Sequence, residues 1–234
     1  MGLFSYGVWA AICLAKSIAL VAAFLRRPYR HLNSLKGYLT VSLLGEVCEF
    51  FALQRYGFTS PQYRYAYFAS DLTITILGFF VLVHLLELAF EQTSVKLPGL
   101  RTGAMLVFSG AATLSGFFTF EQFGHSLPAF SSQLEQNLSF VGMVLTVLLW
   151  IAMNVMRLPG VRFRRVVLAF GVLYSSGAII YSIHSLFGQF SEWRYLVPLS
   201  TLLEAGLLAY TLVAPDEIPV EIYGKDMEPA RRPA

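Results

Sequence analysis

The sequence predicts an all-α fold, a polytopic membrane protein built as a bundle of seven transmembrane helices. Of its 234 residues, 56% are hydrophobic and 15% aromatic, while 13% are charged, about half the charged share of a typical soluble domain. Seven apolar segments of bilayer length fill the chain almost from end to end, because a hydrocarbon core of roughly 30 Å needs about 20 helical residues. Short polar loops separate these segments.

The prolines support the positions of the seven spans. Six of them fall in loops or at helix ends, where a missing amide donor costs little, and Pro198 lies near the start of the last span. The predicted spans are 4–25, 38–56, 65–89, 102–121, 130–156, 164–187 and 194–213. They form a transmembrane domain over residues 1–214, and residues 215–234 form a short polar tail.

The basic residues predict the orientation of the bundle. Thirteen of the 17 lysines and arginines lie in alternate loops and in the tail, at positions 26, 27, 30, 36, 96, 101, 157, 162, 164, 165, 225, 231 and 232. The opposite loops hold only Arg55, Arg64 and Arg194. The positive-inside rule therefore places the N-terminus outside and the C-terminus in the cytoplasm.

A charged side chain inside an apolar span is costly, so each one needs a partner or a purpose. The spans contain Lys16, Glu46, Glu49, Asp71 and Glu204. Counted along the helices, Lys16, Glu46 and Glu204 lie within about two turns of the bilayer centre. If the seven helices form a ring in sequence order, Lys16 lies between Glu204 and the two glutamates of the second span. This pattern is typical of a proton or cation site, although such an ion pair can also serve only to hold helices together.

Polar stripes at helical spacing extend this charge group. They comprise Ser42, Glu46 and Glu49 in the second span, Asp71, Thr75 and Gly78 in the third, Tyr174, Gly177 and Tyr181 in the sixth, and Ser200 and Glu204 in the seventh. Facing one another, they would line a cavity open to the outside, with His184 and Glu135 near its rim, and such a lining suits a small ligand. Alternatively, the stripes mediate hydrogen bonds between helices. His84 and Glu87 are expected to form a separate contact near the cytoplasmic end.

Several familiar chemistries of seven-helix proteins are disfavoured. The seventh span has no lysine for a retinal Schiff base, and the two histidines within spans, His84 and His184, lie at different depths, which does not suit a di-haem protein. Two intramembrane histidines are also too few for a zinc hydrolase. We therefore predict no catalytic residue, no cofactor and no metal site.

Four features resemble an uncharacterised family of bacterial seven-helix membrane proteins. They are the basic turn Arg26-Arg27-Pro28-Tyr29-Arg30, the tyrosine-rich entry to the third span, Leu134-Glu135 at the start of the fifth, and Pro215-Asp216-Glu217 after the seventh. The chain is also similar, more weakly, to the seven-helix sensor regions of bacterial histidine kinases. The resemblance implies a lone seven-helix bundle in the bacterial inner membrane, without an attached output domain.

These observations favour a ligand-binding or sensory membrane module with an outward-facing polar cavity. Its expected partners are the lipid bilayer, an unknown small ligand and a separate cytoplasmic protein that carries the signal, but no nucleic acid. A small transporter that uses Lys16, Glu46 and Glu204 for proton coupling is the main alternative, and the sequence shows no inverted repeat for it. An intramembrane enzyme comes third, because no nucleophile–base pair is found.

Overall fold

The computed structural model describes residues 3–25, 33–91, 99–123, 127–155, 161–187 and 193–214, and all regular secondary structure within them is helical. The helices are α1 (Leu3–Leu25), α2 (Asn33–Tyr56), α3 (Pro61–Glu91), α4 (Leu100–Phe123), α5 (Leu127–Val155), α6 (Val161–Phe187) and α7 (Trp193–Val213). Each predicted span coincides with one helix to within a few residues at its ends. The predicted tail, residues 215–234, lies outside the described residues.

Six of these helices, α1 and α3 to α7, are long and apolar enough to cross a membrane, as expected of a multi-pass membrane protein. Helix α2 has 24 residues but is less apolar than these six, since it carries two acidic and two basic side chains. Its side chains nevertheless form two distinct faces, an exposed apolar face and a buried face that carries polar residues. Leu44, Val47 and Phe51 are exposed on one side at spacings of three and four, whereas Ser42 is fully buried.

The turn between α2 and α3 shows how the sequence makes neighbouring helices antiparallel. Gly57 has a φ of 77°, and its N–H donates to the carbonyl of Leu53 at 2.9 Å, which ends α2 in a left-handed cap. Ser60 then caps α3, since its Oγ accepts from the Tyr63 N–H at 3.1 Å, and Pro61 occupies the first helical position.

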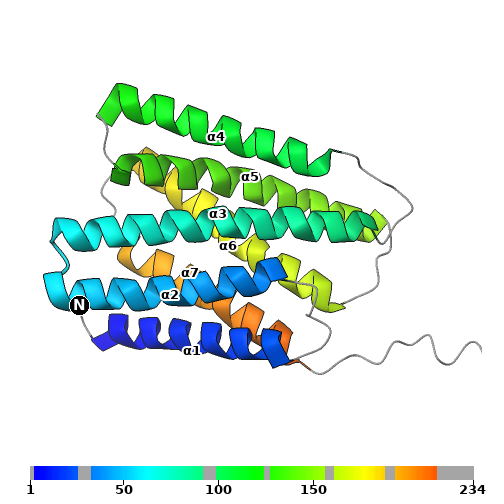
Figure 1. Cartoon of the computed structure of the whole chain (residues 1–234), viewed down its shortest axis with the longest axis horizontal. Helices are drawn as coiled ribbons and strands as arrows, with labels where there is room; N and C mark the ends of the chain where they lie inside the picture. Colours follow the sequence, from blue (N-terminus) through cyan, green and yellow to red (C-terminus); the bar gives the residue numbers. More distant parts are fainter. Residues whose placement is uncertain are drawn as a thin grey trace, which may run out of the picture.

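Six helices form a closed ring in the order α1, α2, α3, α5, α6, α7, and α4 lies outside it against α5 (Figure 1). The expected ring of seven helices in sequence order is therefore wrong at α4, because α3 packs directly on α5. The reason lies in α4 itself. Its buried residues Ala111, Ser115 and Thr119 form one narrow stripe, while residues such as Leu106 and Phe117 are exposed. This stripe packs mainly on α5, and Phe108 adds a smaller contact with Phe79 and Phe80 of α3.

The two halves of the bundle differ in chemistry. We call the end where α1 begins the N-terminal end and the end where α7 finishes the C-terminal end. The main apolar core fills the C-terminal half with Ala19, Ala22, Ala23, Leu35, Leu39, Val81, Leu82, Leu85, Leu149, Met153, Val166, Val167, Phe170, Leu208 and Leu212. Most of the charged residues singled out from the sequence lie at mid-depth or toward the N-terminal end.

Candidate functional site

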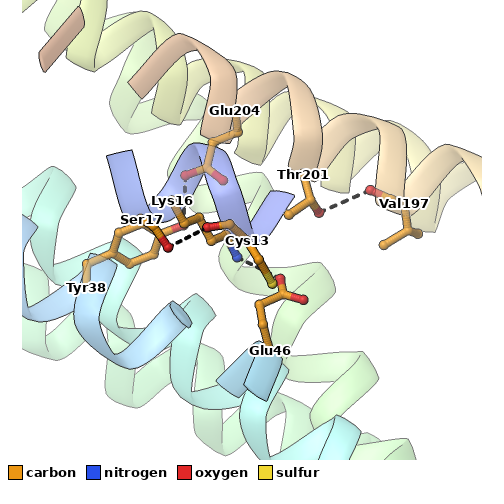
Figure 2. Close-up of polar contacts among 8 residues, drawn as sticks. All are labelled: Cys13, Lys16, Ser17, Tyr38, Glu46, Val197, Thr201 and Glu204. Atoms are coloured by element: carbon orange, nitrogen blue, oxygen red, sulfur yellow. Dashed lines mark hydrogen bonds and ion pairs between the residues drawn. The ribbon is translucent and has the colours of Figure 1, made fainter. Parts of the chain in front are cut away.

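An ion pair joins α1 and α2 in the middle of the bundle. Lys16 Nζ lies 2.8 Å from Glu46 Oε1, and the two side chains are only 4% and 14% exposed (Figure 2). Of the three glutamates that the sequence offered to Lys16, the structure brings Glu46 into direct contact. A buried ion pair of this kind is stable only while both partners are present.

Glu204 brings α7 into the same group. Its side chain is 1% exposed, and its Oε1 accepts a hydrogen bond of 2.8 Å from the hydroxyl of Tyr38 on α2 (Figure 2). Lys16 also attracts the Glu204 carboxylate electrostatically. Sequence reasoning missed Tyr38, although a signal was present, because Tyr38 lies four residues before Ser42 on the stripe that also carries Glu46.

Ser42 and Glu49 complete the stripe of α2. Ser42 is 0% exposed, and its hydroxyl has no hydrogen-bond partner within the part of the protein that the structure describes. Glu49 interacts electrostatically with Glu46, Asp71 and Lys16. It therefore links the central charges to a second polar cluster nearer the N-terminal end.

This second cluster lies where α3, α5 and α6 meet. The carboxyl groups of Asp71 and Glu135 are hydrogen-bonded to each other, and the Tyr181 hydroxyl donates to Glu135. Because an ionised carboxylate has no donor, such a pair must hold at least one proton. One turn toward the N-terminal end, Ser131 Oγ donates to the carbonyl of Phe68 at 3.0 Å and holds α5 against α3. Glu135 was expected only at the cavity rim, whereas it is the direct partner of Asp71.

The stripes of α3 and α6 also meet at Tyr174, which is 2% exposed. Its hydroxyl donates to the carbonyl of Thr75 at 3.2 Å, and its ring lies directly against Gly142 of α5. At Gly78 a Cβ would stand 2.7 Å from the Tyr174 hydroxyl. The stripes of α3 and α6 thus meet at this depth, and the ring of Tyr174 lies between them.

One predicted lining residue, Ser200, forms its hydrogen bond within its own helix. Its Oγ donates to the carbonyl of Val197 at 2.8 Å. The side chain of His184 lies outside the described residues. Nearer the C-terminal end, His84 Nδ1 lies 3.7 Å from Glu87 Oε2, which is the separate contact expected from the sequence.

The described residues contain no group of three or more His, Cys, Asp or Glu side chains placed to hold a metal ion. What the site offers is a set of carboxyl, hydroxyl and ammonium groups held in a low-dielectric interior.

A comparison of the chain with protein-family models, curated proteins and solved structures finds no match in any of the three.

Proposed function

We propose that this protein is an integral membrane module that binds a small polar ligand from outside and signals through a separate cytoplasmic partner. The proposal includes seven spans, with α2 crossing the bilayer in the ring, and an N-terminus outside the bacterial inner membrane. The orientation is supported by the thirteen-to-three distribution of basic residues between opposite loops.

One observation carries the proposal, the division of the bundle interior into two halves. Lys16, Glu46, Asp71 and Glu135 lie between mid-depth and the N-terminal end, and the C-terminal half is filled by apolar side chains. A ligand that reaches the charged group from outside would meet a closed apolar floor. This arrangement suits binding and signalling better than passage through the bundle.

A proton-coupled transporter is the second candidate, favoured by the buried Lys16–Glu46 pair with Glu204 beside it. Carboxyl groups at this depth are typical of proton relays in transporters. This function would require the apolar half to open in another conformation, so that the site faces each side of the membrane in turn.

The two functions differ in what Glu204→Gln should change. Wild-type protein is screened by thermal unfolding against small polar metabolites, and each stabilising compound is then tested for flux into proteoliposomes with and without a pH gradient. For a binding module we expect stabilisation that Glu204→Gln weakens, and no flux in either form.

The matched control is Glu87→Gln, which removes a carboxylate near the C-terminal end and away from the site. It should leave stabilisation by the compound unchanged. Uptake that is driven by the pH gradient and abolished by Glu204→Gln would establish the transporter instead. Unaltered stabilisation in both Glu204→Gln and Glu46→Gln would show that the central charges take no part in binding.

A further inference from the structure

The Ser42 hydroxyl, like those of Ser34 and Ser70, is an exception among the described helical hydroxyls, because it has no hydrogen-bond partner. Many serines and threonines donate to a carbonyl of their own helix, among them Ser17, Thr40, Thr73, Thr113, Ser115, Thr119, Thr146, Ser176, Ser182 and Thr211. Ser42 is fully buried and makes no such bond. Since buried polar groups are nearly always hydrogen-bonded, its oxygen is available to a ligand.

Helix geometry places this oxygen beside the central charges. Tyr38, Ser42 and Glu46 follow one another at intervals of four residues and share one face of α2. Tyr38 contacts Glu204 of α7, and Glu46 contacts Lys16 of α1 (Figure 2). Ser42 stands between these two contacts, so it faces the seam where α1 and α7 pack together.

The charges at this seam do not balance. Lys16 pairs with Glu46 at 2.8 Å, whereas the hydrogen-bond partner of Glu204 is the neutral hydroxyl of Tyr38. One ammonium group therefore serves at least two carboxyl groups, since Lys16 also attracts Glu49, and ionisation of Glu204 would add one uncompensated negative charge. An uncompensated charge in the interior is strongly unfavourable.

We propose that this seam binds one sodium ion through the Glu204 carboxylate and the Ser42 hydroxyl, with the Tyr38 oxygen as a third ligand. All three donors are oxygens, which hard cations prefer. A single excess negative charge matches a monovalent rather than a divalent ion. This inference rests on the proposed function, because it assigns a cation to the same central site. Sodium binding itself does not require the unknown small ligand.

The experiment measures equilibrium binding of ²²Na⁺ to the purified full-length protein in lipid nanodiscs, with choline chloride keeping the ionic strength constant. We expect saturable binding of one ion per chain and a thermal unfolding midpoint that rises with sodium but not with choline. Ser42→Ala should weaken binding about tenfold or more, the scale of losing a group close to a bound metal. Glu204→Gln should abolish binding.

The control is Ser17→Ala, which removes a hydroxyl beside Lys16 that donates to the Cys13 carbonyl at 2.7 Å. Sodium affinity should stay within twofold of wild type. If Glu204→Gln fails to fold, the comparison of Ser42→Ala with Ser17→Ala still decides the matter. Equal effects of the two serine variants, or a stability that responds to pH alone and not to sodium, would overturn the proposal.

The outcomes also separate this inference from the proposed function. Sodium binding without any stabilising metabolite would support the ion site and leave the ligand-binding function unsupported. A metabolite that binds and stabilises the protein, together with no effect of sodium, would support the ligand-binding function and overturn the ion site.

Discussion

At the scale of single residues, Lys16 organises the interior because it is a buried cation that the neighbouring carboxyl groups attract. It is 3% exposed and lies between Glu46, its ion-pair partner, and Glu204. The gain from such a pair is modest when both partners are present, since each ion is removed from water. The loss is large when only one remains.

Replacing Lys16 with Met should therefore destabilise the protein by about 3–5 kcal/mol, because the carboxylate of Glu46 is left buried and unpaired. The measurement is the free energy of unfolding of the purified protein in detergent. Adding Glu46→Gln should restore part of the loss. Glu49→Gln is the matched control, and an equal rescue by both glutamine variants would contradict the specific pairing of Lys16 with Glu46.

At the scale of helices, small residues determine how closely α3, α5 and α6 approach one another. The buried side chain of Tyr174 crosses from α6 to the carbonyl of Thr75 on α3, and it passes directly over Gly142 of α5. This packing requires a residue without a Cβ at position 142. Position 110 of α4 does not require glycine, because a Cβ added at Gly110 would meet nothing within 4 Å.

Gly142→Ala should consequently cost about 1–3 kcal/mol of stability, as the new methyl group forces the Tyr174 ring and its hydrogen bond to shift. Gly110→Ala is the control, which should be neutral or gain up to about 1 kcal/mol from helix propensity. Unfolding free energies of the two variants test this directly. Equal stabilities for both would mean that α5 and α6 are not as closely packed as the structure has them.

At the scale of the whole molecule, the bundle is asymmetric along its axis. The apolar core occupies the C-terminal half, and the basic residues predict that this half faces the cytoplasm. Described members of the basic set, such as Lys36 at the start of α2 and Arg165 at the start of α6, lie at this end. Most of the other basic residues that carry the orientation argument fall in segments outside the described residues.

A reporter active only in the cytoplasm should be active when fused after Pro215 and inactive when fused in the turn at residues 57–60. A reporter active only outside should give the opposite pattern. A further fusion near residue 29 tests whether α2 crosses the bilayer, because its activity should match that at Pro215. Identical activities at residue 29 and in the turn would remove α2 from the spans, and a fully reversed pattern would overturn the orientation.

Most residues of the candidate site could be predicted from the sequence, but which of them contact one another could not. Counting positions along apolar segments placed Lys16, Glu46 and Glu204 at similar depth, and the structure joins them. The partnership of Asp71 with Glu135, and that of Glu204 with Tyr38, was not foreseen. Depth can be counted along a helix, whereas the rotation of each helix about its axis is decided by its neighbours.

The helices, their approximate lengths and the charges within them follow from the amino-acid sequence alone, because bilayer-length apolar runs and their boundaries are local properties of the chain. The charge asymmetry of the loops is likewise the sole basis for the predicted orientation. The tertiary structure alone decided that α4 lies outside a ring of six and that Lys16 pairs with Glu46 rather than Glu49. Both outcomes depend on which faces of separate helices pack together. The residue pattern of one helix does not determine which face of another helix will pack against it.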